Sequence, residues 1–217
     1  MRRYFIIFAC LLTALTAAAK SDTSVTAKSV DINVVLKSDG TASVTETWEI
    51  SKSGEKDLYF LVFASGTRMK IEDLSVSSNI REQYKGLGLN NKVGHVHPSD
   101  GHFAGMYKQK DENKFGYHKL WIREKTDGDI TFTISYTLKN AMLSLKDYDV
   151  LNIAFYPFSY SPERGKVTIS VSGNTSEKDV MAWSYGAQTS STIEGGVITL
   201  VPDMHPISTS PAYVLDR

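Results

Sequence analysis

The chain has 217 residues, of which 41% are hydrophobic, and its 24 basic side chains balance 24 acidic ones. Such a composition supplies a folded core, so the chain is not of the disordered class. A formal net charge of zero provides no positive field for nucleic acid, and we expect no nucleic-acid partner. The length suits one all-β domain.

Residues 1–19 have the layout of an export signal. Arg2 and Arg3 precede an apolar run at residues 4–15, and small residues follow as far as Ala19. The run is shorter than the ~20 residues that span a membrane as a helix. We therefore expect cleavage after Ala19 and an exported chain, in the periplasm, on the cell surface, or anchored at the membrane outside the cytoplasm.

Cys10 is the single cysteine and lies inside this segment. A mature domain without cysteine has no disulfide, so its apolar core must supply the stability. Cys10 has an alternative interpretation as the acylated residue of a lipoprotein signal. Bulky Phe8 and the continuing apolar run fit that alternative poorly, and we favour cleavage after Ala19.

The mature domain is expected to begin with a β-hairpin. Residues 20–28 are small and polar and predict a flexible lead-in to a single domain at residues 29–217. Within residues 30–50 apolar residues alternate along two halves, the pattern of strands with one buried face. Asp39-Gly40 supplies the turn, because both residue types tolerate positive φ.

Glu46 interrupts the apolar row of the return strand. The other members of the row are Ala42, Val44, Trp48 and Ile50. A buried carboxylate is costly unless it is paired or neutralised, so we expect Glu46 to be partly buried with a hydrogen-bonding or basic partner. The candidate basic partners are Arg68, Arg81 and Arg123. The alternative is a ligand-binding or catalytic carboxylate.

The later chain repeats short apolar or alternating runs between turn residues. The predicted strands lie within residues 58–64, 71–76, 115–123, 130–138, 150–158, 167–171, 180–185 and 197–200. Residues 140–148 predict at most one or two helical turns, and residues 213–217 the start of a further strand. About ten strands with little helix indicate an antiparallel β-sandwich, immunoglobulin-like or related.

Several motifs follow one another in an order that resembles a known family. They are Asp39-Gly40, Val44-Thr45-Glu46, IEDLSV at 71–76, TFTISYT at 131–137, DYDVLNIAF at 147–155 and VMAWSYG at 180–186. Together they resemble the N-terminal extracytoplasmic domain of predicted bacterial membrane proteins, domain of unknown function 2207. The resemblance spans nearly all of the mature chain.

This resemblance implies a β-domain on the secreted side, followed in other members by membrane helices, with no established activity. No apolar segment follows here, so we expect either a fragment that stops before a last strand and the membrane helices, or a free soluble member.

A histidine cluster is the strongest candidate for metal chemistry. His95, His97 and His102 lie within a short polar segment that also contains Asp100. Neutral imidazole is a common ligand, so the cluster predicts a zinc or copper site, with metal-dependent hydrolysis as its function. A solvated loop is the simpler interpretation, since ordering a loop around a metal costs conformational entropy.

Aromatic residues offer a third hypothesis. Tyr156 and Tyr160 flank Pro157 beside a predicted loop and are the candidates for stacking on sugar rings, as in a carbohydrate-binding module. Most aromatic residues are expected in the core, where they bury large areas.

The leading functional prediction is an exported envelope domain that binds or assembles and is not an enzyme. We expect no cofactor, and an envelope protein or a glycan as partner. Membrane association would come only from a missing C-terminal segment or from a lipidated Cys10.

Overall fold

The computed structural model describes residues 24–54, 58–63, 69–87, 103–108, 117–154, 162–172, 180–185, 189–202 and 212–216. These ranges contain fifteen strands and no helix. Within them no helix is long and apolar enough to cross a membrane. The all-β fold class expected from the sequence is confirmed.

The bounds of the strands are β1 (Ser24–Leu36), β2 (Ala42–Ser53), β3 (Leu58–Phe63), β4 (Lys70–Ser78), β5 (Lys85–Leu87), β6 (Phe103–Lys108), β7 (Tyr117–Arg123), β8 (Gly128–Lys139), β9 (Met142–Ser144), β10 (Asp149–Ala154), β11 (Arg164–Val171), β12 (Met181–Tyr185), β13 (Thr189–Glu194), β14 (Val197–Pro202) and β15 (Ala212–Asp216). The longest strands are β1, β2 and β8, with 13, 12 and 12 residues.

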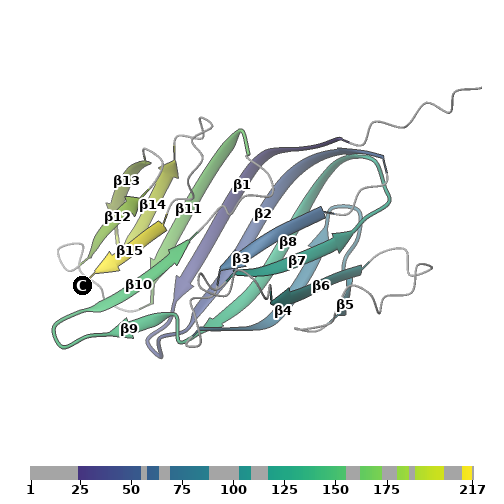
Figure 1. The fold of residues 1–217 in the computed structure, drawn as a ribbon. Helices are drawn as coiled ribbons and strands as arrows, with labels where there is room; N and C mark the ends of the chain where they lie inside the picture. Colours follow the sequence, from purple (N-terminus) through teal and green to yellow (C-terminus); the bar gives the residue numbers. More distant parts are fainter. Residues whose placement is uncertain are drawn as a thin grey trace, which may run out of the picture.

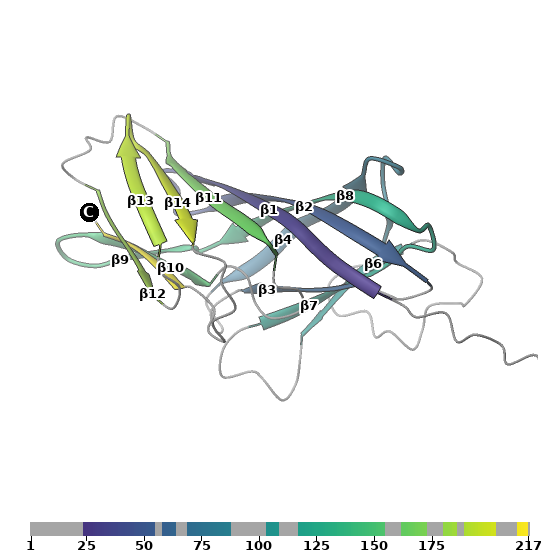
Figure 2. The same cartoon turned by 90° about the horizontal axis from the view of Figure 1, so that it is seen from above.

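Three sheets form two layers. The large sheet has seven strands in the order β13-β14-β11-β1-β2-β8-β4. Two four-stranded sheets, β12-β15-β10-β9 and β3-β7-β6-β5, lie side by side against one face of the large sheet (Figures 1 and 2). The arrangement is a β-sandwich in which one layer is divided into two sheets.

The core lies between these layers. Along β1, β2 and β8 buried side chains alternate with more exposed ones, so each strand turns one face inward. Leu58 and Ile122 of one small sheet and Leu151 of the other join the large sheet in a single cluster of buried residues. One continuous core therefore connects all three sheets.

The opening hairpin forms as its sequence predicts. Gly40 has a φ of 78°, a left-handed conformation that glycine adopts without a side-chain clash. The backbone N–H of Lys37 donates to the Thr41 carbonyl at 2.9 Å. Asp39 Oδ1 accepts from the Thr41 backbone N–H at 3.0 Å and from its hydroxyl at 2.6 Å. These bonds fix the register of β1 against β2.

The structure corrects three expectations. Residues 24–28, expected in a flexible lead-in, belong to β1, and residues 24–27 pair with β2. The sandwich is not wholly antiparallel, because β1 pairs with β11 and β5 with β6 in parallel. Residues 140–148 form no helical turn; most of this segment is β9 and its tight connection to β10.

The strand expected at the end of the chain is confirmed. β15 pairs with β10 on one side and β12 on the other, so it is an interior strand of its sheet.

Candidate functional site

Glu46 occupies the middle of the inner face of the large sheet. It lies on β2 opposite Ile32 of β1 and Ile134 of β8, both buried. Only 6% of Glu46 is exposed, as the alternation of β2 requires for a residue between buried Val44 and Trp48. Glu46 is therefore buried more completely than the partly buried position that we expected.

Two neutral donors hold the Glu46 carboxylate. The Trp48 indole Nε1 donates to Oε2 at 2.9 Å, and the Tyr136 hydroxyl donates to Oε1 at 2.7 Å. Burial raises the pKa of Glu46 above its usual value, although both hydrogen bonds act in the opposite direction. Burial, followed by the nearby carboxylate, also raises the pKa of Tyr136.

Two of the three basic partners proposed for Glu46 contact other residues. In the part of the chain that the structure describes, Arg81 pairs with Glu124, with its Nε 3.3 Å from Oε2. The Arg123 guanidinium lies over the Trp121 ring, 4.9 Å from the ring centre. Arg68 falls outside the described residues. Glu46 is thus held by side chains of its own sheet.

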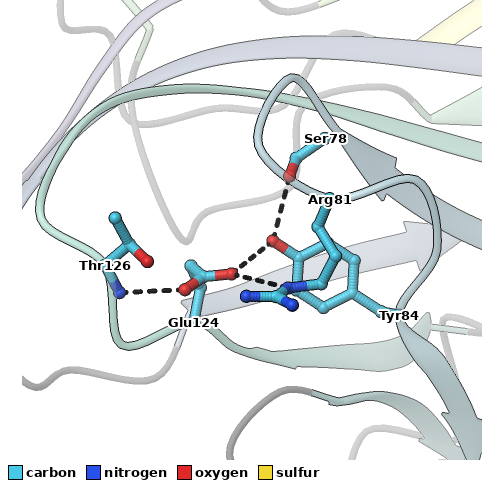
Figure 3. A network of polar contacts seen from close by, with 5 residues as sticks. All are labelled: Ser78, Arg81, Tyr84, Glu124 and Thr126. Carbon is cyan, nitrogen blue, oxygen red and sulfur yellow. Dashed lines mark hydrogen bonds and ion pairs between the residues drawn. The ribbon is translucent and has the colours of Figure 1, made fainter.

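A second buried carboxylate, Glu124, joins two sheets (Figure 3). It follows β7 and is 2% exposed. Its Oε2 accepts from the Tyr84 hydroxyl at 2.7 Å and pairs with Arg81, while its Oε1 accepts from the Thr126 backbone N–H at 2.9 Å. Tyr84 and Arg81 follow β4 of the large sheet, so the cluster ties that edge to β7.

Tyr84 is enclosed by this cluster. Its hydroxyl lies 3.2 Å from the Ser78 hydroxyl, its ring lies under the Arg81 guanidinium at 5.7 Å, and it packs against Phe132. Burial is the main cause of the raised pKa of Tyr84. Sequence reasoning missed this cluster. A signal was present, because Glu124 continues the alternation of Leu120 and Ile122 on the buried side of β7.

A polar hollow of about 420 Å³ opens beside the turn of the first hairpin. Asp39, Lys37, Ser144 and Asp149 are among its lining residues. The hydrogen bond from the Thr41 side chain lowers the pKa of Asp39, so its carboxylate is ionised at neutral pH. Asp149 Oδ1 accepts from the Ser144 hydroxyl at 2.7 Å. The hollow is thus lined largely by polar residues of the β1–β2 turn and the β9–β10 hairpin.

The outer face of the large sheet carries a continuous row of short polar side chains. One residue from each of the seven strands lies in register, and none of the seven is buried. This polar row consists of Thr192, Thr199, Thr168, Asn33, Thr45, Ser135 and Ser75. Neighbouring strands lie about 4.8 Å apart, so the row offers regularly spaced hydrogen-bonding groups over the width of the sheet.

The other predicted sites lie outside the described residues. They include the metal candidates His95, His97 and His102, the sugar-stacking candidates Tyr156 and Tyr160, and the signal segment with Cys10. Among the residues that are described, no group of three or more histidine, cysteine or acidic side chains is placed to hold a metal. These three site hypotheses stay predictions.

Residues 26–207 match the N-terminal domain of the predicted membrane protein family DUF2207. The chain belongs to this family. The resemblance noted in the sequence motifs is confirmed, and this DUF2207 domain is a domain of a predicted membrane protein family with an all-β fold. A search of curated proteins gives no match.

Solved structures share the fold at very low sequence identity. The DUF2207 domain aligns with leukotriene A4 hydrolase from Saccharomyces cerevisiae at a TM-score of 0.50 and 10% identity, covering 90% of this chain and 30% of that one. Yeast LTA4 hydrolase in complex with bestatin gives a TM-score of 0.50 at 9% identity, covering 90% and 29%. A zinc metallopeptidase of the M1 type from Deinococcus radiodurans gives 0.44 at 9% identity, covering 89% and 43%. The chain spans less than half of each relative, and the likeness to the two LTA4 hydrolase structures describes the fold alone.

Replacing Glu46 by Gln is expected to change how stability depends on pH. A raised carboxyl pKa means that the folded state binds more protons than the unfolded state between the two pKa values, so wild-type stability falls as pH rises above about 4.5. Each pH unit in that interval costs about 1.4 kcal/mol. The free energy of unfolding of Glu46→Gln, minus that of the wild type, should therefore rise with pH.

Urea unfolding at a series of pH values measures this difference. Glu82→Gln, at an exposed residue after β4, is the matched control and should follow the wild type. A pH-independent difference for Glu46→Gln would contradict the raised pKa.

Replacing Tyr84 by Phe is expected to destabilise the domain by about 1–3 kcal/mol, because a buried carboxylate oxygen loses a donor. Tyr148→Phe removes a hydroxyl from an exposed tyrosine and should change the free energy of unfolding little. Denaturant titration compares the two variants. Equal changes in the free energy of unfolding for the two variants would show that the Glu124 cluster does not tie the sheets together.

Proposed function

We propose that this DUF2207 domain lies outside the cytoplasm as part of a membrane protein and acts by binding or assembly rather than by catalysis. The basic and apolar layout of residues 1–19 supports export. The family match supports attachment to a membrane protein. Because the described buried carboxylates, Glu46 and Glu124, are engaged by donors from their own fold, they serve the sandwich itself.

The observation that carries the binding role is the polar row. Its seven side chains are uncharged and accessible, and each has a hydroxyl or amide group that donates and accepts hydrogen bonds. Threonine also has a high intrinsic preference for β-strands. That preference alone does not explain why a polar residue lies in register on each of the seven strands. Charged residues of this face flank the polar row: Asp31, Glu49 and Lys166 lie on one side of it along the strands, and Glu72 and Lys139 lie on the other.

Such a surface suits an extended, neutral and hydroxyl-rich partner. An envelope glycan fits this description, because its hydroxyl groups can exchange hydrogen bonds with a row of Thr, Ser and Asn side chains. An envelope protein with a polar strand or sheet surface is the other partner class. Neither partner requires the strong positive charge that nucleic acid would require.

Cysteine footprinting in intact cells tests both the location and the surface. In a Cys10→Ser background, Asn33→Cys places one thiol in the polar row, and Lys125→Cys places one in the exposed connection between β7 and β8. A membrane-impermeant maleimide should label both sites in intact cells if the domain lies outside the cytoplasm. Occupation of the polar row should make labelling at Asn33→Cys slower than in the purified protein, with a smaller change at Lys125→Cys.

Two results would contradict the proposal in different ways. Labelling of neither site until the cytoplasmic membrane is opened would place the domain inside the cell. Equal slowing at both sites, or none at either, would show that the polar row is not covered by a partner.

A further inference from the structure

We propose that the outer face of the β12-β15-β10-β9 sheet rests on a lipid bilayer surface. The exposed large hydrophobic residues Leu143, Leu145, Tyr148 and Met181, here called the apolar face, are its described members. The inference rests on the proposed function only in taking the domain to be attached to a membrane.

The β9–β10 hairpin has two unlike sides. Leu143 pairs with Val150, and Ser144 with Asp149. The Leu145 backbone N–H donates to the Tyr148 carbonyl at 2.9 Å, which continues the same register to the turn. Since successive residues alternate across a strand, Leu143, Leu145, Tyr148 and Val150 share one side, and Ser144 and Asp149 the other.

A hairpin in water usually turns its apolar residues inward and its polar residues outward, and this hairpin does the opposite. Ser144 and Asp149 face the polar hollow and bond to each other at 2.7 Å. The side that faces solvent carries Leu143, Leu145 and Tyr148, which are 41%, 43% and 39% exposed. A polar inner side and an apolar outer side are expected where the outer side meets an apolar partner.

The same side continues across the sheet. Leu151 pairs with Leu215, which places Val150 beside Asp216, and Asp216 pairs with Met181. The row that begins at Leu143 therefore passes through the acidic residue Asp216 before it reaches Met181, which is 50% exposed. The apolar face thus has members at the β9–β10 hairpin and on the opposite edge strand β12, with Asp216 of β15 between them.

The position of β15 identifies the bilayer as the partner. In this family the domain is N-terminal within predicted membrane proteins, so the membrane part follows it in sequence. β15 is the last described strand and lies inside this sheet, between β10 and β12. In both views the C-terminal end lies near the β9–β10 hairpin (Figures 1 and 2). The last described strand thus belongs to the sheet with the apolar outer side.

The charges at the hairpin turn favour no particular lipid. Lys146 and Asp147 at the turn cancel, Asp149 lies on the other side, and Asp216, which pairs with Met181, adds one acidic residue to the row. Tyr148 has an apolar ring and a polar hydroxyl, a combination enriched where membrane meets water. Contact between the apolar face and the bilayer should therefore require that the domain is anchored to the membrane and that its apolar side chains are present. It should depend little on anionic lipid or on salt concentration.

A vesicle experiment with the whole chain tests this contact. In a Cys10→Ser background, Lys146→Cys places an environment-sensitive NBD dye between Leu145 and Tyr148 without removing an apolar residue, and Asn33→Cys places the same dye on the polar row. A polyhistidine tag after Arg217 attaches the protein to phosphatidylcholine vesicles that contain nickel-chelating lipid, which sets the high local concentration of a membrane-anchored domain.

The dye at Lys146→Cys should brighten and shift to shorter wavelength on attachment, while the dye at Asn33→Cys should not. The paired change Leu143→Ser and Leu145→Ser should lower the contacting fraction about tenfold, because each serine removes an apolar group from the interface. Val197→Ser and Val201→Ser, at exposed valines of β14, are the matched control pair and should leave the signal unchanged.

Three outcomes would overturn the proposal. The first is a response of the dye at Lys146→Cys that is no larger than the response of the dye at Asn33→Cys. The leucine changes could leave its response intact, which would mean proximity without contact. The response could also appear without vesicles as protein concentration rises, which would assign the apolar face to a second copy. Failure here leaves the cell-based labelling result unaffected, because that experiment reports on location and on the polar row.

Discussion

Burial of one face of the seven-stranded sheet is the constraint on which this domain depends. β1, β2 and β8 each present an inward row of mostly apolar side chains, and such a surface cannot remain in water without a large loss of stability. Two small sheets cover it side by side, so one core serves all three sheets. Glu46 and Glu124 are tolerated in this interior because hydroxyl, indole and backbone donors replace the water they lose.

With the core so organised, the surfaces left for interaction lie on opposite sides of the sandwich. The outer side of the large sheet carries the polar row, and the outer side of the β12-β15-β10-β9 sheet carries the apolar face. A domain that rests one side on a membrane would present the other toward the surrounding envelope. The two proposed contacts are therefore compatible in a single molecule, and each can be disrupted without the other.

The sequence predicted what alternation controls. The hairpin of β1 and β2, the strand β8 and the burial of Glu46 all follow from a two-residue period. Apolar residues at every second position show which face of a strand is buried. It did not predict the parallel pairing of β1 with β11, which depends on contacts distant in sequence. The partners of Glu46 were also missed. Tyr136 lies 90 residues away on β8, and only the register of β2 against β8 brings its hydroxyl to the carboxylate.

Fluorine NMR during urea unfolding tests the shared core most directly. Trp48 lies in the large sheet, Trp121 in the β3-β7-β6-β5 sheet and Trp183 in the β12-β15-β10-β9 sheet, so 5-fluorotryptophan places one reporter in each sheet without any substitution. If one core stabilises all three sheets, the three native resonances should disappear at the same urea concentration, as a cooperative transition requires. Loss of the Trp121 or Trp183 resonance at a lower urea concentration than that of Trp48 would show that a small sheet unfolds by itself, and would contradict the account.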